Sequence, residues 1–321
     1  MKTILVTGGA GYIGSQFAYE MLDLGFKVVI IDNLSTGYKK LVPKKSYFYK
    51  GDLTNINFLK KIFKKQKIEV IFHFAASTSV PESNIKPLKY FKNNVIGTKN
   101  LLDTMMMHKI KYFVFSSTCA VYGNSTKKKM KENDNCLPKN YYGLTKLQCE
   151  NLIKLYSQQF KFKYAILRYF NVVGCDPKLR TGIINRGTLF KSITSNINKR
   201  KYELKVYGNK YKTKDGTCIR DYIDVNDLTN LHVKAYEYIQ KNKSILFNCG
   251  YQKPLSVLNV IKLFETIINK KIKKNFVKKR SGDIEEVYSD TAKLKKFFPK
   301  FKKKYSTSQS IQNMIEWEKR V

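Results

Sequence analysis

The sequence lacks the features that mark membrane, metal-binding and disulfide-bonded proteins. Its apolar runs, such as residues 28–31, are as long as a strand and fall far short of the roughly 20 residues that a transmembrane helix needs. The six cysteines include no Cys-x-x-Cys pair, and with only three histidines they show no spacing typical of zinc sites. The first residues lead directly into glycines, so we expect no signal peptide. These absences predict a cytoplasmic protein with free thiols, no bound metal and no membrane association.

Acidic residues are also scarce, and their scarcity leaves a large positive charge. The chain has 61 lysines and arginines against 24 aspartates and glutamates, a formal net charge of +37, and only seven of the basic residues are arginines. A nucleic-acid-binding protein tends to gather positive charge on one face and to include arginine, whereas here lysine is abundant in every segment. We interpret the lysines as the bias of an AT-rich coding sequence and expect no nucleic acid as partner, although the overall field would attract anionic ligands.

What the sequence does contain is an alternation of short apolar runs and amphipathic stretches. It predicts strands over residues 4–6, 27–31, 70–74, 113–115 and 165–167, and helices over residues 11–24, 58–65, 93–107 and 142–160. Such alternation is typical of an α/β fold with a doubly wound parallel sheet of Rossmann-like type. After Asn171 the strands shorten, which indicates a smaller mixed α/β C-terminal lobe for the substrate. We expect the first domain to comprise residues 1–171 and about 222–248, and the lobe to comprise about 172–221 and 249–321.

A glycine motif follows the first predicted strand and opens the first helix. Gly8 allows a tight turn, Gly11 lets the backbone approach a pyrophosphate, and Gly14 lets the helix lie close to the sheet. Asp32 ends the second strand, where a carboxylate accepts hydrogen bonds from the adenosine ribose and repels a 2′-phosphate, which favours NAD over NADP. Taken alone, the glycines also fit a plain strand-to-helix turn. Asp52 fits either an adenine contact or a capped turn.

A tyrosine and a lysine four residues apart on a predicted helix suggest acid–base chemistry. The spacing of Tyr142 and Lys146 places both on one face, where the ammonium would lower the pKa of the phenol because nearby positive charge favours the phenolate. Such a tyrosine can take a hydroxyl proton as hydride leaves the same carbon, and then return it. Thr118, just past the strand over residues 113–115, could hydrogen-bond the reacting oxygen. A surface pair and a capping hydroxyl are the structural alternatives, but the ordered combination with the glycine motif and Asp32 is far more specific than any member.

Further motifs give the chain a resemblance to a known family. They cover residues 7–14, 32–35, 73–76, 168–171, 215–223 and 280–283. From Lys2 to Trp317 the chain resembles the UDP-glucose (UDP-galactose) 4-epimerases of the extended short-chain dehydrogenase/reductase superfamily. In that family a tightly held NAD oxidises C4 of a UDP-hexose, the 4-keto sugar turns over, and hydride returns to its other face. The resemblance therefore implies an isomerase of carbohydrate metabolism that uses NAD to interconvert UDP-glucose and UDP-galactose.

The resemblance also implies roles for individual residues. Tyr142 would be the base and acid, Lys146 its tuner and a ligand of the nicotinamide ribose, and Thr118 the hydroxyl partner. Cofactor contacts would fall to Gly8, Gly11, Tyr12, Ile13, Gly14, Asp32, Asn33, Asp52, Leu53, Phe74, Ala75, Asn94, Lys146 and Tyr169. The substrate would be held by Thr118, Tyr142, Asn171, Leu189, Tyr207, Arg220, Arg280 and Asp283. Two guanidinium groups can clamp a diphosphate by bidentate hydrogen bonds, which leaves the sugar ring loose enough to turn.

Several alternatives stay open at this point. Arg220 could form a salt bridge with a neighbouring aspartate, and Arg280 could be a surface charge. The superfamily's 4,6-dehydratases carry acidic residues after the threonine, and the Cys119 found here counts against dehydration. Val287 stands where some members have a bulky tyrosine, so the resemblance leads to the hypothesis that UDP-GlcNAc and UDP-GalNAc fit the pocket as well. The helices over residues 93–107 and 142–160 correspond to the family's homodimer contact. Another nucleotide-sugar epimerase or dehydratase and a catalytically silent NAD-binding module are the competing functions.

Overall fold

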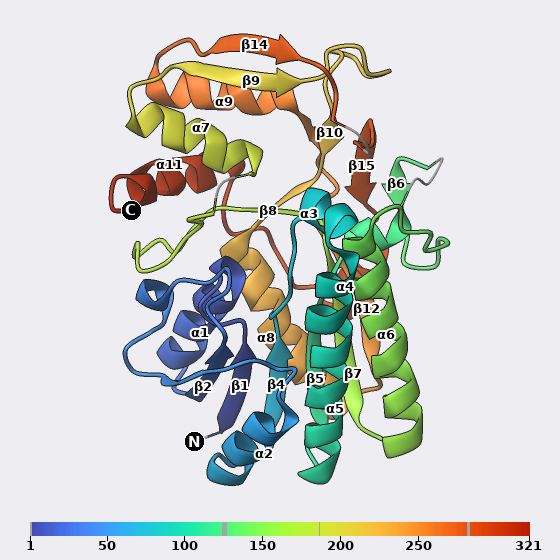
Figure 1. Ribbon diagram of the computed structural model, residues 1–321. Coiled ribbons are helices and arrows are strands. Elements are labelled where there is room, and N and C mark those ends of the chain that lie inside the picture. Colours follow the sequence, from blue (N-terminus) through green and yellow to red (C-terminus); the bar gives the residue numbers. More distant parts are fainter. Residues whose placement is uncertain (1, 124–126, 186, 281–282) are drawn as a thin grey trace. The chain divides into compact units, whose positions relative to one another are not determined.

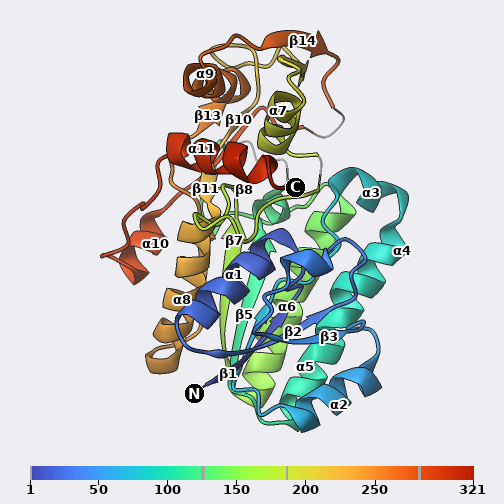
Figure 2. The same cartoon turned by 90° about the vertical axis from the view of Figure 1, so that its left-hand side faces the viewer.

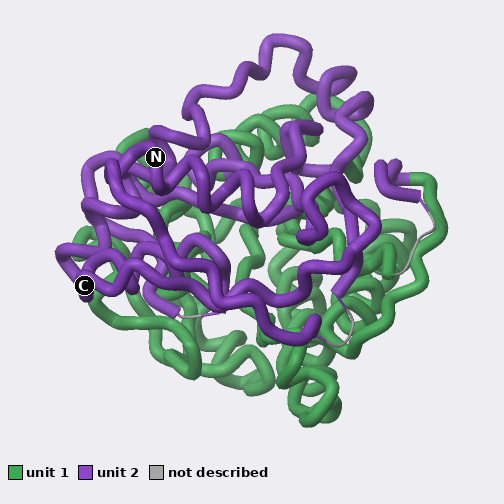
Figure 3. The backbone as a smooth tube through the Cα atoms, turned by 90° about the horizontal axis from the view of Figure 1, so that it is seen from above, with its two compact units in different colours: residues 1–125, 133–169, 229–247 green, residues 126–132, 170–228, 248–321 purple. Residues whose placement is uncertain are grey.

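Each of two structural units is assembled from three separate stretches of the chain (Figure 3). Unit 1 comprises Met1–Ser125, Asn133–Tyr169 and Thr229–Phe247, and unit 2 comprises Thr126–Glu132, Phe170–Leu228 and Asn248–Val321. The computed structural model describes residues 2–123, 127–185, 187–280 and 283–321, so the motif residues Ser281 and Gly282 lie outside the described residues.

Unit 1 is built on a seven-stranded sheet with the order β12-β7-β5-β4-β1-β2-β3 (Figure 1). The strands are β1 (Thr3–Thr7), β2 (Lys27–Asp32), β3 (Tyr47–Lys50), β4 (Val70–His73), β5 (Tyr112–Thr118), β7 (Lys163–Tyr169) and β12 (Ile245–Cys249). In the centre Leu5 lies opposite Val29 of β2 and Ile71 of β4, in parallel register. The central strands β1, β2, β4 and β5 are runs of buried, mostly β-branched and aromatic residues because helices cover both faces. The predicted doubly wound parallel sheet is confirmed.

Helices cover the sheet of unit 1 on both sides, with α1 and α8 on one face and α2, α5 and α6 on the other (Figure 2). Their bounds are α1 (Tyr12–Asp23), α2 (Ile56–Lys65), α5 (Gly97–Met107), α6 (Tyr141–Phe160) and α8 (Val225–Lys241), with the short α3 (Val80–Ile85) and α4 (Pro87–Tyr90) before α5. On the first face Phe72 of β4 contacts Phe17 and Tyr236, with ring centroids 4.3 and 5.7 Å apart. On the second face Leu5 packs in a core with Phe113.

Two differences from the predicted elements fall next to candidate site residues. The strand expected over residues 113–115 extends to Thr118, so Ser116 and Thr118 belong to β5 and do not follow it. Strand β7 pairs with β5 along its whole length, and this pairing continues the strand through the polar residues 116–118. The helix expected over residues 93–107 is preceded by a π-helical turn, Phe91–Ile96, before α5 begins at Gly97. Such wide turns occur often at functional sites.

Unit 2 mixes small sheets with helices, as the sequence predicts for the C-terminal lobe. Its four-stranded sheet has the order β13-β10-β15-β6, and two further pairs are β11-β8 and β14-β9. The strands are β6 (Lys129–Met130), β8 (Asn171–Val173), β9 (Glu203–Tyr207), β10 (Ile219–Arg220), β11 (Tyr222–Asp224), β13 (Leu255–Ser256), β14 (Lys273–Val277) and β15 (Glu286–Ser289). The helices are α7 (Leu189–Asn198), α9 (Val257–Ile268), α10 (Ala292–Phe297) and α11 (Thr307–Glu318). Helix α11 packs against α7 and α9.

Candidate functional site

The glycine motif forms the turn between β1 and α1 that the sequence predicts. Gly8 has a φ of +72°, and a Cβ there would lie 2.6 Å from the amide nitrogen of Ala75, next to Phe74. A Cβ on Gly14 would lie 2.2 Å from the Gly8 carbonyl oxygen, so both positions exclude a side chain. A Cβ on Gly11 would meet one atom of the described residues within 4 Å, the Gly8 oxygen at 3.2 Å. The turn therefore keeps an open approach to its backbone.

Helix α1 begins at this turn with no side-chain cap on its N-terminus. Gly11 is the N-cap residue and has no side chain to cap the helix, while Tyr12 and Ile13 form the first turn. Uncapped N–H groups and the helix dipole together favour an anionic ligand. The turn and helix start thus fit the pyrophosphate of a dinucleotide.

Asp32 lies at the end of β2 beside this turn, as predicted. Its carboxylate accepts hydrogen bonds from the backbone amides of Ala10 at 3.0 Å and Leu34 at 2.8 Å. Burial raises the pKa of Asp32, and the two amide bonds moderate the rise. An acidic group at this position fits a ribose with free hydroxyl groups.

The neighbouring cofactor candidates Asn33, Asp52 and Leu53 lie close together on the following loops. Asn33 donates to the Asp52 carboxylate at 2.9 Å, and the Thr54 amide and hydroxyl donate to it at 2.8 Å each. Burial raises the pKa of Asp52, but the bonds from Thr54 and Asn33 outweigh burial and keep it below its usual value. Asp52 is therefore the capping residue of a turn, which was the structural alternative, and its adenine contact stays a prediction. Leu53 is buried.

Thr118 and Tyr142 are hydrogen-bonded to each other. Tyr142 stands in the first turn of α6, which begins where Asn140 accepts a hydrogen bond from the Gly143 amide at 2.8 Å. The Thr118 hydroxyl oxygen, at the end of β5, accepts from the Ala120 amide at 3.1 Å, and the hydroxyl bonds to the Tyr142 phenol. The structure thus brings together the threonine and the tyrosine that the sequence predicts as partners.

The predicted lowering of the Tyr142 pKa by Lys146 is wrong. Burial raises the pKa of Tyr142 to about 12, although the hydrogen bond from Thr118 lowers it. Lys146 is not among the described groups that shift this pKa. The Lys146 ammonium lies over the Phe115 ring, 4.4 Å from its centroid, and burial lowers its pKa to about 8. Helical spacing correctly gave a shared face, but a four-carbon side chain can place its charge well away from a neighbour on that face.

A buried ion pair beneath α6 is a feature that the motifs do not indicate. Arg168 donates to both carboxylate oxygens of Glu150, through Nε at 2.9 Å and Nη2 at 2.7 Å. The Ser117 hydroxyl donates to the same carboxylate at 2.6 Å, directly before Thr118 in β5. The available signal was that Glu150 lies four residues after Lys146, so a charged residue occupies the buried face of the helix.

A buried histidine joins the end of β1 to the segment before α5. The Thr7 hydroxyl bonds to His73 Nδ1 at 2.6 Å, and His73 Nε2 bonds to the Thr98 hydroxyl at 2.9 Å. Thr98 in turn donates to the Asn94 carbonyl at 2.6 Å. Burial, and then the charge of Lys146, lower the pKa of His73 to about 3, so the ring is neutral.

Asn94 and Tyr169, both predicted as cofactor contacts, use their polar side-chain atoms within the protein. The Asn94 amide accepts from the Ser77 backbone at 2.8 Å and donates to the Thr145 hydroxyl at 3.0 Å. The Tyr169 phenol is hydrogen-bonded to His232. Contacts of these two residues with a cofactor stay predictions.

The other predicted substrate residues line one pocket of unit 2. The pocket has a volume of about 670 Å³, and among its lining residues are Asn171, Leu189, Tyr207, Arg220, Arg280 and Asp283. The Arg280 guanidinium lies over the Tyr207 ring, 3.9 Å from its centroid. Arg220 donates to the Ile219 carbonyl at 2.9 Å, while the Asp221 carboxylate accepts from the Tyr251 amide at 3.0 Å. In the structure Arg220 therefore does not form the alternative salt bridge with Asp221.

Two negative findings concern the described part of the chain. No group of three or more histidine, cysteine or carboxylate side chains there could hold a metal ion. No helix there is long and apolar enough to cross a membrane.

The fold and these side chains define a dinucleotide-binding α/β enzyme with a tyrosine–lysine helix. Residues 4–250 match the NAD dependent epimerase/dehydratase family. The chain is 38% identical to the putative UDP-arabinose 4-epimerase 2 of Arabidopsis thaliana, covering 98% of this chain and 79% of that protein. It is 38% identical to the UDP-glucose 4-epimerase of Lacticaseibacillus casei, covering 91% and 89%. The crystal structure of UDP-glucose-4-epimerase from Stenotrophomonas maltophila, with bound NAD and formylated UDP-arabinopyranose, superimposes with a TM-score of 0.93 at 31% identity, covering 100% and 98%.

The chain belongs to the NAD dependent epimerase/dehydratase family. It is a nucleotide-sugar 4-epimerase that uses NAD, and the resemblance to UDP-glucose 4-epimerases is confirmed. The glycine turn, the uncapped start of α1 and Asp32 fit this cofactor.

Proposed function

We propose that the protein interconverts UDP-glucose and UDP-galactose by transient oxidation at C4 of the hexose. The observation that carries this proposal is the unit 2 pocket, in which all six residues expected to hold the UDP part converge. The glycine turn and Asp32 would hold NAD, which when bound would supply the acceptor and donor of the hydride. Arg220 and Arg280 anchor the diphosphate, so the hexose is free to present either face.

Tyr142 is the proposed acid and base of the reaction. Its phenol takes the proton from the C4 hydroxyl and later returns it, and the Thr118 hydroxyl, already bonded to the phenol, orients the reacting oxygen. Lys146 is the proposed ligand of the nicotinamide ribose. In the structure it does not shift the Tyr142 pKa, so its proposed tuning of Tyr142 belongs to the enzyme with NAD bound. The pH dependence of kcat/KM tests the tuning: a rate that levels off below about pH 9 supports it, and a rate that climbs toward pH 12 contradicts it.

The direct experiment purifies the protein, identifies its bound nucleotide, and follows conversion of UDP-galactose to UDP-glucose without added cofactor. Tyr142→Phe should retain NAD and lose at least a hundredfold in kcat. Tyr141→Phe is the matched control, because this neighbouring tyrosine is 46% exposed. Wild-type protein that binds NAD but leaves every UDP-sugar unchanged would instead identify a catalytically silent NAD-binding module.

The substrate range is a second part of the proposal. One similar protein is named a UDP-arabinose 4-epimerase, and a similar structure is named a UDP-Glc/GlcNAc 4-epimerase. Val287 is buried in β15, directly opposite Arg220 of β10, and its small volume supports acceptance of N-acetylated sugars. Assaying UDP-galactose, UDP-arabinose and UDP-GalNAc with wild type and Val287→Tyr tests this. Equal exclusion of UDP-GalNAc by both proteins contradicts the proposed role of Val287.

We also propose a cytoplasmic homodimer that forms through α5 and α6. Leu101, Leu102 and Met105 are buried in the core of unit 1, whereas Leu155 of α6 is 61% exposed and available for an interface. All six cysteines are free thiols, which supports a reducing compartment. Sedimentation of wild type and Leu155→Lys tests the dimer, because a charge at a buried interface should produce monomers.

A further inference from the structure

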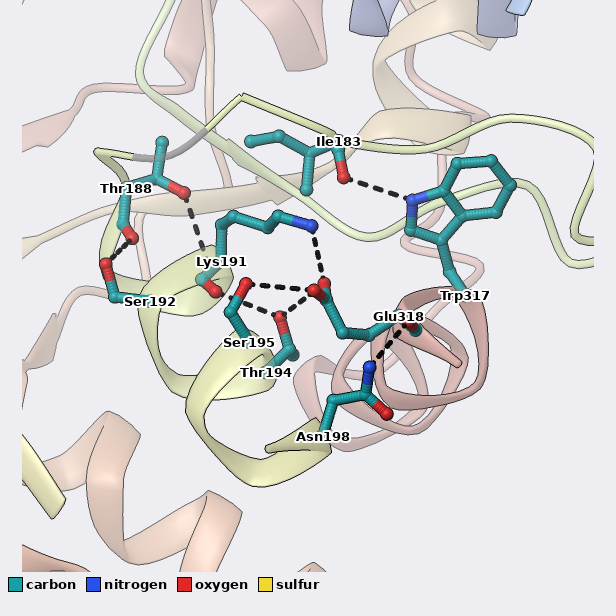
Figure 4. Close-up of polar contacts among 9 residues, drawn as sticks. All are labelled: Ile183, Thr188, Lys191, Ser192, Thr194, Ser195, Asn198, Trp317 and Glu318. Carbon is teal, nitrogen blue, oxygen red and sulfur yellow. Dashed lines mark hydrogen bonds and ion pairs between the residues drawn. The ribbon is translucent and has the colours of Figure 1, made fainter. Parts of the chain in front are cut away.

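The carboxylate of Glu318, at the C-terminal end of α11, is held by three side chains of α7 (Figure 4). Lys191 Nζ lies 2.6 Å from Oε2, the Thr194 hydroxyl 3.2 Å from Oε2, and the Ser195 hydroxyl 2.9 Å from Oε1. Asn198 donates to the Glu318 main-chain carbonyl at 3.1 Å. The side chains of Lys191 and Glu318 are only 4% and 10% exposed, so this is a buried ion pair with its lone pairs satisfied.

The preceding residue of α11 holds the segment that leads into α7. The Trp317 indole N–H donates to the Ile183 carbonyl at 3.0 Å. A Cβ on Gly182 would lie 2.7 Å from the indole nitrogen, so the main chain runs directly against the ring. One end of α11 thus fixes both α7 and the chain before it.

The opposite side of α7 faces the pocket of unit 2. Leu189, Ser192 and Ser195 line that pocket, whereas Lys191 and Thr194 are buried toward α11. Ser195 contacts both α11 and the pocket, because its hydroxyl bonds to Glu318 and the residue also lines the pocket. A shift of α7 would therefore change the shape of the pocket wall.

We propose that Glu318 is a positioning residue, which sets the place of α7 and so the affinity of the unit 2 pocket for a nucleoside diphosphate. The inference rests on the proposed function, in which this pocket holds the UDP part. The Glu318 carboxylate can hold α7 in place because it accepts hydrogen bonds from one ammonium and two hydroxyls along that helix. A buried pair that loses one partner leaves an uncompensated charge, and we expect its move toward water to displace α7.

The test compares Glu318→Gln with Glu316→Gln. Glu316 is the matched control, because it lies on the same helix and pairs with Lys319 at 2.6 Å with both side chains more than half exposed. In Glu318→Gln we expect the Kd for UDP, measured by calorimetry, and the KM for the UDP-sugar to rise about fivefold or more, with kcat within about twofold and bound NAD unchanged. Glu316→Gln should behave as wild type.

A purely structural role for Glu318 gives a different result. If Glu318→Gln lowers Tm but binds UDP as tightly as wild type, the inference is overturned. Thr194→Val keeps the ion pair and removes a hydroxyl that lies 3.2 Å from both the Glu318 carboxylate and the Lys191 carbonyl, so it serves if Glu318→Gln does not fold. About a twofold rise in the Kd for UDP is expected, and an unchanged Kd overturns the inference. Wild type that turns over no UDP-sugar refutes the proposed function, whereas weaker UDP binding by the variants would still support the role of Glu318.

Discussion

Replacing Lys146 by methionine should make the protein more stable and inactive. Burial lowers the pKa of Lys146 from its ordinary 10.5 to about 8, so at neutral pH the fold holds an ammonium that its surroundings disfavour. Each pKa unit corresponds to 1.36 kcal/mol, which gives a destabilisation of about 3 kcal/mol at pH 7. Methionine has a similar length, is apolar, and fits against the Phe115 ring over which the ammonium lies.

The pH dependence gives this prediction its sign. The folded pKa of Lys146 lies below the unfolded one, so the folded state binds fewer protons between about pH 8 and pH 10.5. The destabilisation is therefore present in full below about pH 8 and disappears as the pH rises to 10.5. Lys146→Met should gain about 3 kcal/mol over wild type at pH 7 and little at pH 10, which for 321 residues is about 5 °C in Tm at pH 7.

The assay is denaturant unfolding of nucleotide-stripped protein at both pH values, together with epimerase turnover. Lys154→Met is the control, because Lys154 lies two turns further along α6 with its side chain 37% exposed, and it should show no gain. Two results would refute the reasoning. One is a Lys146→Met protein that is no more stable than wild type at pH 7, and the other is a gain of equal size at pH 10.

Three further predictions concern unit 1. Glu150→Gln leaves the Arg168 guanidinium buried without a counter-charge and should lower the free energy of unfolding by about 3–5 kcal/mol in urea titrations; a loss below 1 kcal/mol would contradict it. Gly14→Ala places a Cβ 2.2 Å from a backbone oxygen and should yield protein without NAD. Gly25→Ala meets no atom of the described chain within 4 Å and, although a φ of +81° strains the turn after α1, should retain NAD. Asp32→Asn should weaken NAD binding about tenfold or more and reduce the protein's preference for NAD over NADP. Fluorescence titration with both nucleotides measures the two affinities.

Much of the fold could be predicted because its signals are local. Glycine spacing, runs of β-branched residues and helical periodicity depend on a few neighbouring positions, and they gave the parallel sheet, the turn at Gly8 and the start of α6 within one residue. The residues of the unit 2 pocket came from the family resemblance, and Asn171 and Asp283 both line it although 112 positions separate them (283 − 171).

Charges inside the protein could not be predicted in the same way. The position of the Lys146 ammonium depends on the side-chain rotamer and on the ring of Phe115, which belongs to β5 and not to α6. Lys191 and Glu318 are 127 residues apart and belong to no motif, so only tertiary packing brings them together. The Tyr142 pKa was mispredicted for the same reason, since burial raises it and the Lys146 ammonium, which lies over the Phe115 ring, does not shift it.

The interleaving of the two units has a consequence for synthesis on the ribosome. Strand β7 ends at Tyr169, but its sheet neighbour β12 begins only at Ile245. At ordinary translation speeds the nascent chain waits roughly 4–15 s before β12 emerges. Throughout that interval one side of β7 offers unpaired amides and carbonyls to any strand nearby. A chaperone that covers this edge during elongation should therefore raise the yield of native protein, and slow codons between these two strands should reduce it.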